Sequence, residues 1–239
     1  MVVPHHLCRA LAEHLTIADS KRAFHAAFPH VIPPLYRRTA DELLVELHLL
    51  SHQKHFQVDA FFAVGLRQVF EAFTRGYRPD GQLADLFKAL CSSTGFDAEA
   101  IQRLASESQA AVAGHSLEDV RGWLETKGEG APAPLAEGLR RASGSSFHYS
   151  RLMAVGVFSL LSAAQGESSA DPELLRKLAH EVSGAIGLSQ ERVDKDLSLY
   201  TSNLERMAQA VELMEETLLA ERRKRERQER DKASKEPKD

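Results

Sequence analysis

The chain has 239 residues, of which 43% are hydrophobic and 27% are charged, and its formal net charge is −4. This composition is that of a folded soluble protein, and the slight negative charge disfavours a dedicated nucleic-acid-binding protein, whose domain is normally strongly basic. The two cysteines, Cys8 and Cys91, lack a metal-type spacing and indicate a reducing compartment without a disulfide framework.

No segment has the sequence features of a membrane span or a leader. The longest uncharged run, residues 152–166, is shorter than the roughly 20 apolar residues that cross a bilayer. The N-terminal segment lacks a continuous apolar core and a small-residue cleavage site, so we expect neither a signal nor a transit peptide. Any work at a membrane is therefore expected at its surface.

Helical periodicity runs through almost the whole chain, and no stretch alternates as a strand does. The sequence predicts a first helix over residues 21–28, capped by Asp19 or Ser20 and ended by Pro29. Pro34 is well placed to begin the second helix.

This second helix carries two pairs of opposite charges spaced four residues apart. Arg37 precedes Asp41, and Arg38 precedes Glu42. Such pairs are worth a few tenths of a kcal/mol each on an exposed face, so we predict that both pairs form on a solvated or inter-helix surface.

Residues 44–73 and 135–164 form an internal repeat at a constant offset. Ala63-Val64-Gly65-Leu66 aligns with Ala154-Val155-Gly156-Val157, at the centre of an apolar stretch in each copy. A glycine inside a helix costs roughly 1 kcal/mol relative to alanine, so its repetition in register indicates close backbone packing. We predict two related buried helices that cross near Gly65 and Gly156.

Shorter helices are predicted between and after the two copies. They cover residues 83–91 and 98–113, followed by a short helix that begins with a capping box at Ser116 and Asp119. A loop is expected over 127–134, and Asp171-Pro172 has the pattern of a further helix start.

The segment from Ser189 onward has a different pattern, an apolar seam with alternating four- and three-residue spacing. This heptad spacing predicts a coiled-coil helix roughly 60 Å long that extends beyond the domain. We expect the first half of the seam to pack on the domain and the second half, from Met207, to contact a partner. The seam consists of Val193, Leu197, Tyr200, Leu204, Met207, Val211, Met214 and Leu218.

Residues 221–230 hold six basic and three acidic side chains. One interpretation is a site for anionic lipid headgroups or an acidic protein surface. The other is a solvated helix face stabilised by its own four-apart pairs, and the mixed charge slightly favours this second interpretation.

Several of these segments together resemble the thylakoid formation protein family of cyanobacteria and chloroplasts. The resemblance is collinear over residues 17–225, with His25, Val58 and Ala60 as local departures. The segments are ADSKRAF (18–24), YRRTADELLVELHLLS (36–51), FFAVGL (61–66), GYRP (76–79), FHYSRLMAVGVFSLL (147–161) and VDKDLSLYTSNLERMAQAVELMEE (193–216).

The resemblance implies an all-helical protein with a protruding C-terminal helix and a role in photosystem II biogenesis and repair. It implies association with an FtsH-type thylakoid protease or photosystem II assembly intermediates. It implies no catalytic residue, and we expect no cofactor or bound metal. Without a leader, the expected location is the cytoplasmic side of a cyanobacterial thylakoid membrane, as a peripheral protein.

His48 and His52 are four residues apart on one helix, with Glu46 nearby, a spacing that can present two imidazoles to zinc. No clear third ligand accompanies them, so a structural or capping role is favoured. No nucleophile elbow, phosphate loop or dinucleotide-binding glycine pattern occurs in the sequence. We therefore predict a non-enzymatic protein.

The sequence thus predicts an all-α fold, a compact multi-helix bundle with a long protruding C-terminal coiled-coil helix. Its parts are a variable N-terminal extension (1–17), a helical body (18–188), the long helix (189–230) and a disordered tail (231–239).

The function predicted from the sequence is that of an accessory protein that binds partners through exposed side chains. The alternatives are a homodimeric coiled-coil scaffold, sensitive to polar substitution of Leu204 and Val211, and a metal-binding enzyme that uses His48 and His52. The predicted interaction residues are Arg37, Arg38, Asp41, Glu42, Leu204, Met207, Val211, Met214, Arg222 and Arg223.

Overall fold

The computed structural model describes residues 15–144, 147–165, 177, 179–181, 183–184 and 189–233. Within these ranges the regular structure is helical and contains no strand, which confirms the predicted fold class. The helices are α2 (Ile17–Ala27), α3 (Pro34–Ser51), α4 (Ala60–Phe73), α5 (Leu83–Ser92), α6 (Ala98–Val112), α7 (Leu117–Glu125), α8 (Ala133–Ala142), α9 (Arg151–Gln165) and α11 (Gln190–Ala233), with a 3₁₀ turn, η1 (Asp80–Gln82), before α5.

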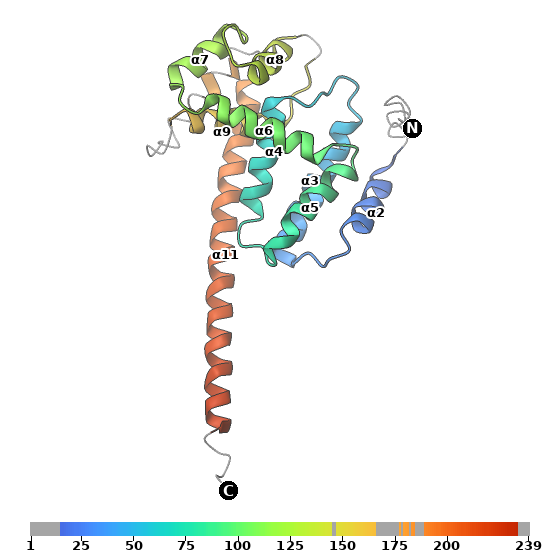
Figure 1. The fold of residues 1–239 in the computed structure, drawn as a ribbon, viewed down its shortest axis with the longest axis vertical. Helices are drawn as coiled ribbons and strands as arrows, with labels where there is room; N and C mark the ends of the chain where they lie inside the picture. Colours follow the sequence, from blue (N-terminus) through green and yellow to red (C-terminus); the bar gives the residue numbers. More distant parts are fainter. Residues whose placement is uncertain are drawn as a thin grey trace.

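Helices α2–α9 gather into a body, and α11 passes along it and then protrudes (Figure 1). With 44 residues, α11 is about 66 Å long at 1.5 Å per residue. The long C-terminal helix is thus confirmed. No helix in the described part of the chain combines the length and the hydropathy that a membrane span requires.

Local capping signals account for several helix starts. The predicted capping box at Ser116 and Asp119 is present at the start of α7. The same device begins α2, where Thr16 accepts a hydrogen bond from the Asp19 backbone and the Asp19 side chain accepts one from Thr16 in return. The prediction that Asp19 or Ser20 caps this helix was therefore wrong, because Asp19 is the third helical residue of the box. The predicted helix start at Asp171-Pro172 lies outside the described residues.

Each copy of the internal repeat begins inside one helix, continues through a loop and covers all or nearly all of the next helix. The first copy covers the second half of α3 and all of α4, and the second covers most of α8 and nearly all of α9. The glycine-centred parts alone, α4 and α9, are the two buried helices that the repeat predicted.

The two repeated glycines lie where α4 and α9 cross. A Cβ atom on Gly65 would overlap the carbonyl group of Leu152, and one on Gly156 would overlap the carbonyl group of Phe61. Only a residue without a side chain fits at such a distance. The predicted close crossing is confirmed, and both helices contribute buried side chains to the hydrophobic core.

The heptad seam of α11 packs on the body further along the helix than predicted. Val193 and Leu197 are buried as expected, but Met207 and Val211 are also buried, each with 8% of its surface exposed. Val211 lies against Gly76, where an added Cβ would come within 2.7 Å of its Cγ1 atom. The body therefore covers the seam as far as Val211, including residues that were expected to contact a partner, whereas Leu218 at the end of the seam is 57% exposed.

Candidate functional site

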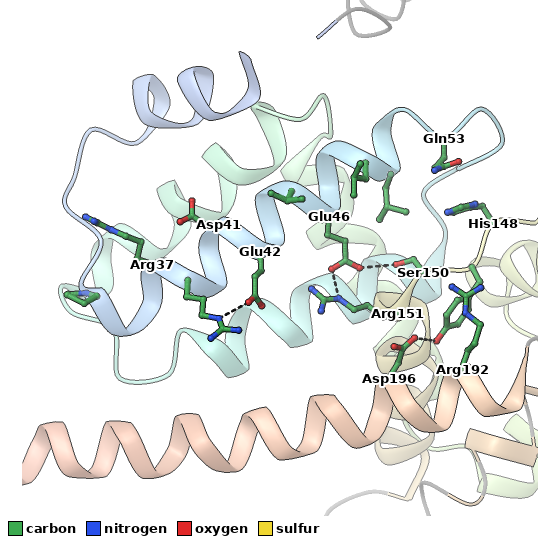
Figure 2. A pocket seen from close by; sticks show the side chains of 16 residues that line it. Arg37, Asp41, Glu42, Glu46, Gln53, His148, Ser150, Arg151, Arg192 and Asp196 are labelled. Atoms are coloured by element: carbon green, nitrogen blue, oxygen red, sulfur yellow. Dashed lines mark hydrogen bonds and ion pairs between the residues drawn. The ribbon is translucent and has the colours of Figure 1, made fainter. Parts of the chain in front are cut away.

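An open groove runs along α3 on the surface of the body. It has a volume of about 940 Å³ and lies between α3, the segment that leads into α9 and the first turns of α11. The predicted interaction residues Arg37, Arg38, Asp41 and Glu42 all line it. Figure 2 shows Arg37, Asp41 and Glu42 along α3. We call this surface the α3 groove.

The two predicted charge pairs of α3 have different outcomes. The Nε atom of Arg38 lies 2.8 Å from Oε1 of Glu42, in an exposed ion pair. No ion pair within 4 Å joins Arg37 to Asp41, although both residues are described, so that half of the prediction was wrong. Arg37 therefore lines the groove without the predicted ion-pair partner.

A buried carboxylate, Glu46, occupies the middle of the groove wall. The Nε atom of Arg151, at the start of α9, donates to its Oε2 atom over 2.7 Å, and Ser150 Oγ donates to Oε1 over 3.5 Å (Figure 2). The Glu46 side chain is only 15% exposed. Burial raises the pKa of its carboxyl group, and the Arg151 charge partly offsets that effect. This pair fastens α3 to α9 along the groove.

The far wall of the groove joins α11 to the same cluster. The hydroxyl group of Tyr149 donates to Oδ2 of Asp196 over 2.7 Å, and the guanidinium group of Arg192 lies 5.3 Å from the centre of the Tyr149 ring. Burial and the Asp196 carboxylate raise the pKa of Tyr149, which keeps the phenol protonated as a donor. Sequence reasoning did not predict the contact between Tyr149 and Asp196, because these residues are 47 positions apart in the chain and no local pattern links them.

A smaller cavity of about 280 Å³ continues the α3 groove between α3 and α11. It shares Arg38, Glu42, Arg151 and Asp196 with the α3 groove, and Leu199 on its wall is 48% exposed. Ion-paired side chains and an exposed leucine thus lie on one continuous surface.

The remaining predicted interaction residues lie on α11 and do not line the α3 groove, although Met207 lines the smaller cavity that continues it. Met214 is half-buried. Met207 and Val211 are buried against the body, which corrects their assignment as contact residues, and Leu204 is partly buried beside them. Arg222 and Arg223 are exposed on the protruding part of the helix.

The histidine pair of α3 is used in local structure. Nδ1 of His48, which is buried, lies 2.9 Å from Ser20 Oγ in α2. Burial lowers the pKa of His48 and so favours the neutral imidazole. The Nδ1 atom of His52 donates to the His48 carbonyl oxygen over 2.8 Å at the end of α3.

Neither metal nor thiol chemistry is evident elsewhere in the described residues. They contain no group of three or more histidine, cysteine or acidic side chains placed to hold a metal ion. Cys91 is fully buried, and burial raises the pKa of its thiol to about 12. The arrangement is suited to polar recognition along a groove.

Comparison with known proteins connects this structure to one family. The model of the thylakoid formation protein family matches residues 16–229. Protein Thf1 of Prochlorococcus marinus (strain MIT 9313) is 61% identical over 220 residues, which cover 92% of this chain and 90% of the relative. Protein Thf1 of Synechococcus elongatus is 42% identical over 213 residues, 88% of this chain and 84% of the relative.

A solved structure agrees with these sequence matches. The structure of Psb29 at 1.55 Å superposes with a TM-score of 0.77 at 35% sequence identity, covering 88% of this chain and 98% of that chain. The sequence relatives and the shared fold lead to one assignment: the chain belongs to the thylakoid formation protein family.

Proposed function

We propose that this protein is a non-enzymatic accessory factor in photosystem II biogenesis and repair. In this role it binds an FtsH-type thylakoid protease, photosystem II assembly intermediates, or both, as a peripheral protein on the cytoplasmic side of the thylakoid membrane. The observation that supports a binding role is the α3 groove, a large open surface lined by charged side chains of both signs. Binding to one assembly state raises the population of that state by mass action.

The α3 groove suits a polypeptide better than a small metabolite. Its lining on α3 runs from Pro34 to Leu50, which is about 24 Å along the helix. Its volume of about 940 Å³ lies at the upper end of the range of small-molecule pockets. The exposed side chain of Leu49 offers an apolar contact between the charged groups, and charges of both signs along the rim favour specificity and fast association.

A pull-down from solubilised cyanobacterial thylakoid membranes tests this proposal. The tagged wild-type protein is expected to recover the protease or photosystem II proteins. Exchanging charges in the groove, with Arg37→Glu and Asp41→Arg, is expected to reduce recovery at least about tenfold, since charge complementarity across the rim is lost. Recovery of neither protease nor photosystem II proteins by the wild-type protein would contradict the proposed function.

A matched exchange on the exposed face of α6 serves as the control. Arg103→Glu with Glu107→Arg has the same four-residue spacing and the same unchanged net charge, and neither position lines the groove. We expect this variant to recover partners as the wild-type protein does. Equal recovery by both exchanged variants would place the interface outside the α3 groove.

Truncation separates the body from the protruding helix. A deletion after Asp196 would remove the buried side chains of Leu197, Tyr200, Met207 and Val211 and so damage the core. A chain that ends at Glu216 keeps all of these. Retained recovery by that chain supports an interface on the body, whereas complete loss would move the interface to the protruding part of α11.

A further inference from the structure

One exposed stripe of α11 carries charges whose sign reverses along the helix. Successive members of the stripe are three, four or seven residues apart, so they lie on one face of the helix as the residues of the buried seam do. At 100° per residue, this face lies about 130° around the helix from Met207 and Val211. All of them are exposed. We call this the outer stripe, and it consists of Glu205, Glu212, Glu216, Leu219, Arg223 and Arg230.

The same reversal of charge is found when all residues of α11 from 205 to 230 are counted, inside and outside the outer stripe. Residues 205–217 contain four glutamates and one arginine, a net charge of −3. Residues 218–230 contain six basic and three acidic side chains, a net charge of +3. The two segments are equally long, so the helix is divided into acidic and basic halves of equal and opposite charge.

Such a helix is complementary to a second copy of itself in one orientation. In an antiparallel pair whose two-fold axis passes between Thr217 and Leu218, Glu205 lies opposite Arg230 and Glu212 lies opposite Arg223. Each pair occurs twice by symmetry. Gln209 and Glu226, the remaining heptad positions of this face, lie opposite each other without repulsion.

A parallel pair reverses this balance, because each residue then lies beside its own copy. Glu212 would face Glu212 and Arg223 would face Arg223, and like charges at such positions are destabilising. The charge order therefore favours the antiparallel orientation over the parallel one.

The surface around the outer stripe leaves room for a second helix. At its acidic end the stripe borders a hollow of about 550 Å³ between α4 and α11, lined by Glu71, Arg75 and Glu205 among others. Near its centre Leu219 is 53% exposed. A second helix would cover this leucine, and its basic end would reach the hollow.

We propose that the protein self-associates through the outer stripe. Residues 205–230 of two α11 helices pack antiparallel in this dimer, over 26 residues or about 39 Å. This interface differs from a heptad-seam dimer, because the body already covers the seam at Met207 and Val211. Exposed ion pairs are individually weak and screened by salt, so the association is weak and favoured at low ionic strength.

Sedimentation equilibrium of the full chain at about 50 mM and about 500 mM NaCl, which differ several-fold in screening length, tests the proposal. Dimer is expected at the lower salt and loss of dimer at the higher. Glu212→Arg and Arg223→Glu alone should each raise the dimer dissociation constant at least about tenfold, since two attractive pairs become repulsive. The two substitutions together should restore the wild-type constant, because every pair becomes opposite again.

The orientation is tested by disulfide cross-linking in chains that carry Cys8→Ser. Glu205→Cys mixed with Arg230→Cys is expected to give a 205–230 cross-link under mild oxidation, whereas Glu205→Cys alone gives no dimer band. Cys91 is buried and so does not compete. A 205–205 cross-link from the single variant would contradict the antiparallel arrangement.

Other outcomes would overturn the proposal. These are a monomer at every concentration in low salt, an Arg223→Glu variant that dimerises as the wild type does, or failure of the double exchange to restore association. A monomer that binds phosphatidylglycerol vesicles, and that loses this binding with Arg223→Glu, would also contradict the proposal. The basic residues of 218–230 would then bind a lipid surface and not a second α11 helix. Unchanged circular dichroism and melting temperature in all variants would show that folding is intact.

Discussion

Gly65 of α4 and Gly156 of α9 face each other at the helix crossing, each against the backbone of the opposite helix. A methyl group at Gly65 would displace α9, so Gly65→Ala is expected to lower the free energy of unfolding by at least about 2 kcal/mol. Gly122, inside α7, has open space around its added Cβ. Gly122→Ala should raise stability by about 0.5–1 kcal/mol. Urea denaturation of both variants measures the difference, and a stabilising Gly65→Ala would contradict the close crossing.

Two arginine–glutamate ion pairs with nearly equal N–O distances should contribute differently to the free energy of unfolding, because the carboxylate of one of them is largely buried. Arg151 and Glu46 lie 2.7 Å apart with Glu46 15% exposed, whereas Arg38 and Glu42 lie 2.8 Å apart at the surface. Arg151→Ala leaves a buried carboxylate without its main partner and is expected to cost about 2 kcal/mol. Arg38→Ala should cost at most about 0.5 kcal/mol.

Double-mutant cycles with Glu46→Gln and Glu42→Gln measure the coupling energy in each pair. A coupling energy for Arg151 and Glu46 no larger than that for Arg38 and Glu42 would show that solvent screens both pairs alike.

The orientation of α11 predicts unequal effects at two neighbouring apolar positions. Val211 is 8% exposed and packs over Gly76, while Leu213 is 65% exposed. Val211→Ala is expected to lower the free energy of unfolding by about 1–2 kcal/mol through the lost methyl groups and the cavity they leave. Leu213→Ala should change it by less than about 0.5 kcal/mol. A larger effect at Leu213 in dilute monomer would mean that the helix is rotated from the position described here.

Signals within one turn or one helix predicted much of the fold. The box at Ser116 and Asp119, the start at Pro34 and the repeated glycines each depend on a few neighbouring residues, and the structure confirms each of them. Thr16 and Asp19 have the same three-residue spacing, so the same rule predicts the true start of α2. The error there was to place the cap at Asp19 or Ser20 and not at Thr16, three residues before Asp19.

The candidate site was less predictable, because its contacts join distant parts of the chain. Glu46 meets Arg151 across 105 positions and Tyr149 meets Asp196 across 47, and no periodicity links such residues. The heptad seam likewise predicts that a face of α11 is covered. It does not say by what, because an apolar side chain such as Val211 packs equally well on the body or on a partner.

A buried N-cap, Asp59, makes the stability of the body dependent on pH. Its carboxylate accepts the Phe62 N–H over 2.9 Å and begins α4. Burial raises the pKa of Asp59 from 3.8 to about 6, although backbone donors and the charge of Arg141 oppose the shift. Because the folded state holds this proton more tightly than the unfolded state, stability falls as the pH rises from about 4 to about 6 and then levels off.

Asp59→Asn keeps the hydrogen-bond acceptor and removes the ionisable group. The variant should match the wild-type protein near pH 4 and exceed its free energy of unfolding by up to about 3 kcal/mol above pH 7, since one pKa unit corresponds to about 1.4 kcal/mol. Asp119 is the control of opposite sign, because the backbone N–H and hydroxyl of Ser116 lower the pKa of its carboxyl group. Asp119→Asn should therefore lose stability at neutral pH and converge with the wild type in acid. Urea denaturation from pH 4 to 8 measures the slope expected for Asp59, and denaturation below about pH 4 measures the convergence expected for Asp119→Asn, because the lowered pKa of Asp119 lies there. An Asp59→Asn curve parallel to that of the wild type from pH 4 to 8 would show that Asp59 does not titrate in this range.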